Sequence, residues 1–140
     1  MDLTGRAIAI TGATSGIGEA TALACTRAGA AVALAGRRAD RLDAVVATIE
    51  DEGGRAIALP TDVTNEDEAR AFVQQTYEQL GGLDGLINNA GVMLLGPVTG
   101  ADTNEWRQML EVNCLGLLYC THAALPVMGQ AGGGHIVNVA

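Results

Sequence analysis

Short apolar runs alternate along the chain with longer segments in which apolar residues recur at helical spacing. A strand buried on both faces is apolar throughout, whereas a helix that buries one face is not, so the runs predict strands and the longer segments predict helices. The predicted strands span residues 7–11, 31–35, 56–60, 83–88 and 135–139. The predicted helices span residues 17–28 and 40–52, from a cap at Thr64 to Gly81, and from Asp102 to about Met128.

Regular alternation of strands and helices is typical of an α/β fold with a parallel sheet and right-handed crossovers. We expect a doubly wound sheet of order 3-2-1-4-5 in three layers, with a ligand at the carboxyl ends of the strands where the order reverses. Asp67 lies three residues after Thr64 and completes the pattern of a capping box at the third helix. No repeat or linker divides the chain, so residues 1–140 are predicted to form one domain.

The composition indicates a folded chain, and its net charge excludes some classes of binding partner. The 140 residues are 49% hydrophobic and 17% charged, which suits a chain that buries a core. The net charge of −8 argues against nucleic acid or an anionic membrane as a partner. The acidic runs at residues 50–52 and 66–68 are expected to be solvated helix ends.

The three cysteines, Cys25, Cys114 and Cys120, have no spacing of a metal site and lie in predicted helices. Unpaired, buried thiols fit a reducing cytosol, so we expect a cytoplasmic protein without a metal. The start of the chain has no features of a signal peptide, and no apolar stretch is expected to reach membrane-spanning length.

A glycine-rich segment, residues 11–18, lies between the first predicted strand and the first predicted helix. Gly12 would allow a sharp turn, Gly16 the close approach of a bulky anion, and Gly18 the close packing of the helix on the sheet. The free N–H groups of the helix and its positive dipole end would then face a pyrophosphate. The alternative is a flexible glycine connector. The candidate cofactor-binding residues here are Gly12, Thr14, Ser15, Gly16, Ile17 and Gly18.

Two arginines follow the second predicted strand. Gly36 stands where dinucleotide-binding folds carry the acid that binds the ribose 2′-hydroxyl, and Arg37 and Arg38 come next. A guanidinium pairs with a 2′-phosphate that a carboxylate would repel. We therefore expect NADP rather than NAD, held by Arg37 first, by Arg38 second, and with Ser15 as a further donor. The alternative is that both arginines cap the next helix in solvent.

Asp62 and Val63 follow the third predicted strand. The carboxylate of Asp62 could accept from the adenine amino group, with Val63 against the ring. The alternative makes Asp62 an ordinary turn residue before the cap at Thr64.

Residues 88–91, Asn-Asn-Ala-Gly, close the fourth predicted strand. Their short amides can bond neighbouring backbone, while Ala90 and Gly91 leave space for a ribose and a nicotinamide. A plain Asn-rich turn is the alternative.

Asn113 follows Val112 in the middle of the fourth predicted helix. Asn is a poor residue for a helix interior, and such a local conflict flags a functional position. The alternative is an Asn that pairs with a neighbouring helix. The histidines at 122 and 135 have no partner at useful spacing and are interpreted as structural, and Trp106 and Met109 as packing residues.

The glycine segment, the Asn-Asn-Ala-Gly motif and Asn113 together resemble the short-chain dehydrogenase/reductase family, whose fold is a Rossmann-type doubly wound sheet. The resemblance covers the whole chain. It implies that Asn88 stabilises the sheet and that Asn89, Ala90, Gly91 and Val112 contact the cofactor. It also implies that Asn113 belongs to the catalytic tetrad, where it kinks the helix and holds a water for a proton relay.

The same resemblance implies a catalytic Ser just past the fifth strand, followed by a Tyr-x-x-x-Lys pair. This sequence contains no Lys, and Ser15 is its only Ser. We therefore expect an NADP-dependent oxidoreductase, acting on a carbonyl or a secondary alcohol, present as a cofactor-binding portion that lacks the last strands and is inactive alone. The fifth strand would then be an open edge that favours self-association, giving a homo-oligomer, or marginal stability. The alternatives are a non-catalytic nucleotide-binding module, a half-domain that self-associates, or a piece of a longer protein.

Overall fold

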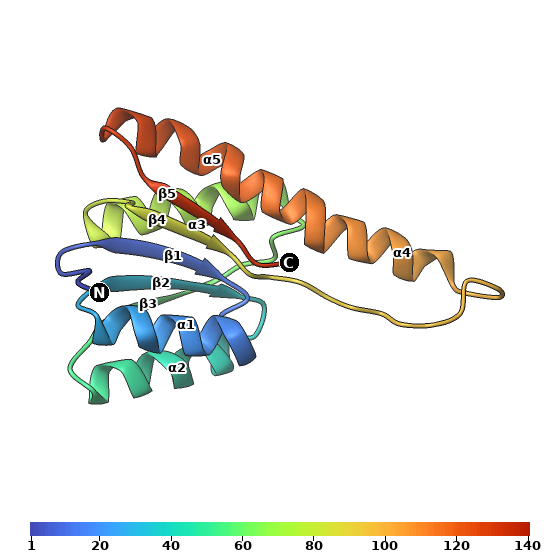
Figure 1. Ribbon diagram of the computed structural model, residues 1–140, viewed down its shortest axis with the longest axis horizontal. Helices are drawn as coiled ribbons and strands as arrows, with labels where there is room; N and C mark the ends of the chain where they lie inside the picture. The colour runs from blue at the N-terminus through green and yellow to red at the C-terminus, as the bar shows by residue number, and fades with distance from the viewer.

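The computed structural model describes all 140 residues, which form a five-stranded sheet between two layers of helices (Figure 1). The strands are parallel and lie in the order β3-β2-β1-β4-β5. The predicted doubly wound fold is therefore confirmed, including its strand order. The strands are β1 (Ala7–Thr11), β2 (Ala31–Gly36), β3 (Arg55–Pro60), β4 (Gly85–Asn88) and β5 (His135–Asn138).

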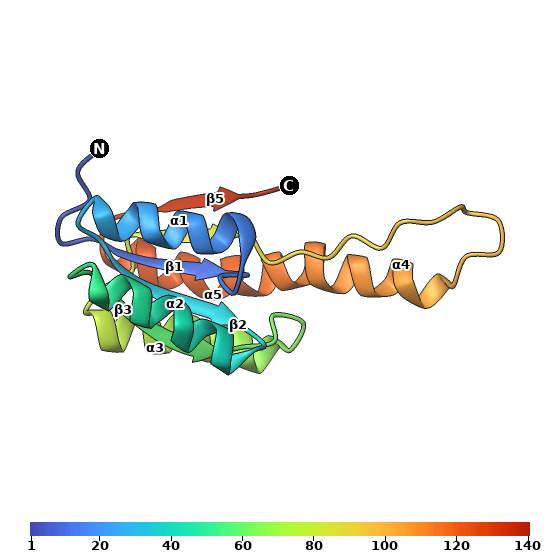
Figure 2. The same ribbon diagram turned by 90° about the horizontal axis from the view of Figure 1, so that it is seen from below.

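Helices cover both faces of the sheet (Figure 2). Each face has its own apolar core. Alternate residues of a strand point to opposite faces. In β1, Ile10 therefore lies in the core under α1 and α2, and Ala9 in the core under α3 and α5. Both are fully buried. The helices are α1 (Gly16–Arg27), α2 (Ala39–Asp51), α3 (Glu66–Leu80), α4 (Thr103–Leu110) and α5 (Leu117–Gln130).

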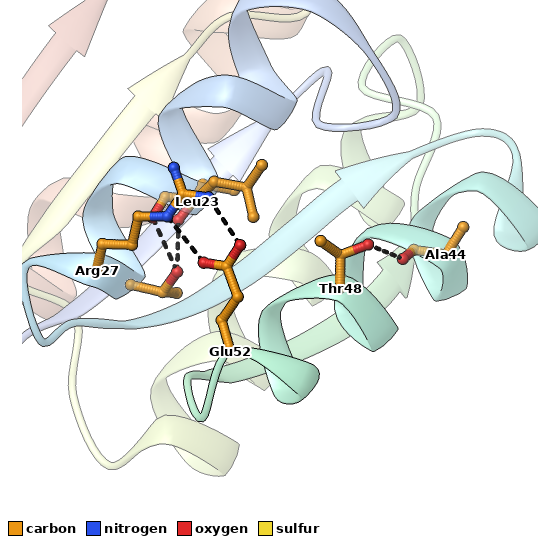
Figure 3. A network of polar contacts seen from close by, with 7 residues as sticks. Leu23, Arg27, Ala44, Thr48 and Glu52 are labelled. Atoms are coloured by element: carbon orange, nitrogen blue, oxygen red, sulfur yellow. Dashed lines mark hydrogen bonds and ion pairs between the residues drawn. The ribbon is translucent and has the colours of Figure 1, made fainter.

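An ion pair joins the end of α1 to the end of α2. Arg27 Nε and Nη2 donate to the two carboxylate oxygens of Glu52 at 2.8 and 2.7 Å (Figure 3). The hydrogen bonds raise the pKa of the Arg27 guanidinium and lower the pKa of the Glu52 carboxyl. Both side chains are well exposed, so solvent screens the pair and it adds little stability. Apolar packing is what holds these helices on the sheet.

The fourth predicted helix is continuous but not regular. Between α4 and α5 lies a π-helical segment, η1 (Glu111–Gly116). Together with the loop before it, α4 projects beyond the sheet as an arm in both views (Figures 1 and 2). A π-helical turn inside an α-helix is rare and is frequent at functional sites.

This continuous helix, Thr103–Gln130, corrects the expectation that no apolar stretch reaches membrane-spanning length. Its most apolar 18-residue window has a mean hydropathy of 1.3 and is 22% buried. Core helices of soluble proteins meet the same criteria of length and composition. Cys120, Ala124 and Met128 of this helix are buried in the core under α3 and α5.

Three details of the prediction are wrong. The cap of α3 is Asn65, whose Oδ1 accepts from the N–H of Glu68 at 3.0 Å, because the Thr64 hydroxyl instead donates to Asp62 at 2.7 Å. The fourth strand begins at Gly85 rather than at residue 83. Cys114 is exposed rather than buried, because nothing packs on its side of η1, whereas Cys25 is half-buried and Cys120 fully buried.

Candidate functional site

The glycine turn follows β1 at the carboxyl edge of the sheet. Gly12 and Gly16 have φ values of +64° and +57°, a region that favours glycine. A side chain on Gly18 would overlap the carbonyl oxygen of Gly12, so this glycine is required by close packing. A Cβ on Gly16 would meet nothing within 4 Å, so the turn is open to solvent there. The positive φ of Gly12 and the close contact at Gly18 agree with the predicted sharp turn and close packing, whereas the approach of an anion at Gly16 stays a prediction.

The start of α1 leaves donors free at this turn. Ser15 is the N-cap residue, and its side chain makes no capping hydrogen bond. The first N–H groups of a helix have no intrahelical acceptor, so the amides of residues 16–18 are available to a ligand. Ile17 is 63% exposed beside them.

The segment after β4 clamps the glycine turn in place. Asn89 Nδ2 donates to the carbonyl oxygens of Thr11 and Gly12 at 3.3 and 3.0 Å. The backbone N–H groups of Asn89 and Ala90 both donate to Thr11 Oγ1 at 3.0 Å. Sequence reasoning missed Thr11. Its signal was a hydroxyl at the end of an otherwise apolar strand, where it can bond a neighbouring turn.

One cleft brings most of the candidate residues together. It has a volume of about 140 Å³ and lies at the carboxyl ends of the strands, as the topology predicts. Thr61 and Val92 also line this cleft, and the sequence did not predict them as site residues. A larger cavity, of about 600 Å³, lies at the opposite end of β1, β4 and β5, away from the glycine turn. The cleft is lined by Gly12, Thr14, Gly36, Arg37, Thr61, Asp62, Val63, Ala90, Gly91, Val92 and Val112.

The two arginines after β2 differ in position. Arg37 lines the cleft, whereas Arg38 does not and is the N-cap residue of α2 without a side-chain capping bond. Both are exposed, and neither takes part in an ion pair of this chain. Arg37 is therefore the guanidinium that an anion in the cleft would meet.

Asp62 and Val63 line the cleft and also contact other residues: Asp62 bonds Thr64, and Val63 packs against Gly116. Asp62 Oδ1 accepts from the Thr64 N–H at 3.0 Å and from the Thr64 hydroxyl at 2.7 Å, so this carboxylate shapes a turn as well as lining the cleft. Val63 is buried, and a Cβ on Gly116 would lie 2.6 Å from its Cγ2. Gly116 thus lets η1 pack directly on Val63.

Asn113 lies in η1 and reaches the loop after β4. Its Oδ1 accepts from the Val92 N–H and its Nδ2 donates to the Val92 carbonyl oxygen, each at 2.8 Å. The alternative in which Asn113 pairs with a neighbouring helix is wrong, because its partner is a loop. Val112, next to it, lines the cleft.

A buried amide joins β4 to β5 and α5. Asn88 Nδ2 donates to Asn138 Oδ1 at 2.9 Å and to Thr121 Oγ1 at 3.1 Å. Its Oδ1 is buried without a partner. The first bond joins two neighbouring strands and the second joins β4 to α5, which agrees with the sheet-stabilising role expected for this residue.

No group of three or more His, Cys, Asp or Glu side chains is placed to hold a metal ion. The cleft has one cationic wall residue, Arg37, and one anionic one, Asp62, set among small residues. Backbone amides, a guanidinium and small residues suit an extended anionic ligand better than a compact one.

His122 and His135 are both exposed and lie outside the cleft.

Comparison with known proteins gives consistent matches. The family model for short chain dehydrogenases matches residues 6–140. An uncharacterised oxidoreductase of Staphylococcus aureus (strain USA300) is 41% identical over 138 residues, which are 99% of this chain and 59% of that protein.

Solved structures agree with this. A short-chain type dehydrogenase/reductase from Mycobacterium marinum has a TM-score of 0.96 at 36% identity, over 99% of this chain and 57% of that one. A hydroxysteroid dehydrogenase from Escherichia coli has a TM-score of 0.93 at 34% identity, over 98% of this chain and 58% of that one. The chain therefore spans less than two thirds of the length of the relatives it matches.

Proposed function

Because this chain belongs to the short-chain dehydrogenase family, we propose that it is the cofactor-binding part of an NADP-dependent oxidoreductase that interconverts a carbonyl and a secondary alcohol. One observation carries the choice of cofactor. Arg37 lines the cleft of the glycine turn and has no carboxylate partner in a chain of net charge −8. An unpaired guanidinium in an acidic protein favours an anionic group at that position.

The residues fit a dinucleotide along the edge of the sheet. Gly16 leaves its side of the turn open, the Ser15 hydroxyl is free, and the α1 amides can bind the pyrophosphate. Asp62 and Val63 would contact the adenine. Toward the other end, Asn89, Ala90, Gly91 and Val112 would surround the ribose and nicotinamide. When bound, the nicotinamide supplies or accepts the hydride.

Asn113 is the proposed catalytic residue of this chain. Its two bonds to Val92 hold the amide in place, and one N–H of the amide group remains for a water on a proton path. The chain has no Lys, and Ser15 is its only Ser. We therefore expect residues 1–140, as one domain, to bind the cofactor without turnover. Three unpaired cysteines support a cytoplasmic location.

The test is a fluorescence titration with NADPH and NADH. The unmodified chain is expected to bind NADPH at least about tenfold more tightly than NADH, a difference of about 1.4 kcal/mol. Arg37→Asp should reverse this preference, because a carboxylate repels the 2′-phosphate. Arg38→Asp should have a smaller effect, and Arg107→Asp on α4 is the control with the same change of charge. An unchanged preference in Arg37→Asp would refute the assignment of the 2′-phosphate site.

A second proposal, self-association into a homo-oligomer, rests on the edge of the sheet. β5 pairs only with β4. Val137 on this strand is 51% exposed, and Val139, just past its end, is 37% exposed. An apolar open edge is a template for pairing with a second copy. Sedimentation over a range of concentrations should show association that Val137→Lys reduces. Leu125→Lys, on the exposed side of α5, is the control. If Leu125→Lys reduced association and Val137→Lys did not, pairing through β5 would be contradicted.

A further inference from the structure

Glycine at position 36 is required by one side chain, Thr14, and not by the backbone. Gly36 is the last residue of β2, and its φ lies outside the left-handed region. A Cβ built on it would lie 2.5 Å from Thr14 Cγ2, closer than real Cβ atoms approach other atoms. The next neighbour, Leu42 Cδ2, would lie 3.5 Å away, which is ordinary van der Waals contact. Thr14 is therefore the one obstacle to a side chain at this position.

The backbone on both sides of this contact is held in place. Gly36 pairs with Pro60 in β3, and its carbonyl oxygen accepts from the Thr61 N–H at 2.8 Å. On the other side, the Ala13 N–H donates to the Ala35 carbonyl oxygen at 3.1 Å, which fixes the glycine turn against β2. A side chain at position 36 could be accommodated only if Thr14 rotated, and β-branched side chains are restricted in that rotation.

The contact lies where cofactor preference would be decided. Thr14, Gly36 and Arg37 all line the same cleft. A carboxylate at position 36 would accept from a ribose 2′-hydroxyl and would repel a 2′-phosphate. It would also neutralise Arg37 beside it.

We propose that Thr14 is a specificity-determining residue: its methyl group excludes any side chain, and so any carboxylate, from position 36 and leaves Arg37 unopposed. This inference rests on the proposed dinucleotide site, because it concerns which cofactor that site accepts. It assigns the preference to a pair of positions, 14 and 36, and not to the end of β2 alone.

A double-mutant cycle on thermal unfolding tests the steric part without any cofactor. Gly36→Ala should lower the melting temperature by about 5 °C or more, because overpacking is destabilising. In the Thr14→Ala background the same change should cost less than half as much. Gly85→Ala is the matched control, since a Cβ on this β4 glycine would lie 3.5 Å from Ile8, and its effect should be equal in both backgrounds.

Titration with NADPH and NADH tests the specificity part. Gly36→Asp alone should bind both cofactors weakly, because the acid and Thr14 overlap. Thr14→Ala with Gly36→Asp should bind NADH at least about tenfold more tightly than Gly36→Asp does. Thr14→Ala alone should move the preference less than the double variant does.

The outcomes separate this inference from the proposed function. If the chain binds NADPH but Gly36→Ala costs the same in both backgrounds, the inference is wrong and the proposed function stands. An NADPH preference retained by the double variant would also overturn the inference. If the unmodified chain binds neither cofactor, the proposed function fails, and the role of Thr14 in specificity fails with it, whatever the thermal cycle reports.

Discussion

The side-chain amide of Asn113 forms two hydrogen bonds with the backbone of one residue, Val92, and so ties the π-helical segment to the loop after β4. A side-chain amide offers one acceptor and two donors, and the Val92 backbone offers the complementary pair. The projecting arm is thereby attached to the sheet at its base. This is where the chain departs from α-helical geometry.

Asn113→Ala is expected to lower the free energy of unfolding by about 1–2 kcal/mol, because two hydrogen bonds at the surface are lost. Amide hydrogen exchange at Val92 should become faster by the corresponding factor. Asn104→Ala, on α4, is the control, because no hydrogen bond of its side chain is lost. Equal exchange at Val92 in the two variants would contradict a role for the Asn113 amide in holding this loop.

Two glycines of the turn, Gly16 and Gly18, and one glycine of α5, Gly129, should differ in their response to alanine. Gly18→Ala is expected to cost about 3 kcal/mol, because its Cβ would overlap the Gly12 carbonyl oxygen and backbone cannot rotate away. Gly16→Ala should cost only about 1–2 kcal/mol, the penalty of a positive φ in open space. Gly129→Ala in α5, which meets nothing and has no positive φ, should stabilise by about 0.5–1 kcal/mol. Urea unfolding measures all three, and a different ranking would show that packing is not what requires Gly18.

Asn88→Ala should destabilise the fold by about 2–3 kcal/mol, because it removes two part-buried hydrogen bonds that link the buried Asn88 amide of β4 to Asn138 and Thr121. The loss should be greater than for Asn138→Ala, since Asn138 is exposed and water can take its place as the acceptor for Asn88 Nδ2. Thermal unfolding of the two variants gives the comparison. Equal losses would mean that burial of the amide does not matter here.

The cysteines should react in the order of their exposure. Cys114 is exposed, whereas burial raises the pKa of the Cys120 thiol to about 11. Since the thiolate is the reactive form, iodoacetamide at pH 8 should label Cys114 in the folded chain and leave Cys120 unlabelled until unfolding. Peptide mass spectrometry over time measures this. Labelling of Cys120 at the rate of Cys114 would contradict its burial.

The same thiol predicts a dependence of stability on pH. The pKa of Cys120 is higher in the folded chain than its ordinary value of 9.0. The unfolded chain therefore loses this proton first, so the contribution is complete below about pH 9 and is lost as pH rises toward about 11. Burial also raises the pKa of Cys25, which adds in the same direction. Unfolding in urea at pH 8 and pH 10 should show the loss, and Cys120→Ala should reduce the difference.

Elements whose pattern is local were predicted closely. The apolar runs predicted as β1 and β2 are buried almost throughout, and Leu42, Val45 and Ile49, at helical spacing, are the buried residues of α2. The error at Thr64 has a local cause too, because Thr, Asn and Asp compete for the same capping role within three residues. Which of them caps α3 depends on the turn that Asp62 forms.

The candidate site could be predicted as far as its segments, but not its contacts. Thr11 and Val92 were missed because their roles depend on partners 78 and 21 residues away in the chain. The π-helical geometry of η1 was not predicted either, since Asn113 signals a conflict with the α-helix without saying how it is resolved. The exposure of Cys114 was not predicted either, because it depends on which face of η1 the rest of the chain covers.

The amino-acid sequence by itself determined the order of strands and helices, the parallel sheet and the place of the glycine turn, because these follow from hydrophobic period and from backbone freedom at single positions. Only the tertiary structure decided that Thr14 meets Gly36, that Asn89 clamps Gly12, and that Arg37 rather than Arg38 lines the cleft. Such contacts depend on register and distance between strand ends, to within the size of a methyl group, and no local pattern of residues carries that information.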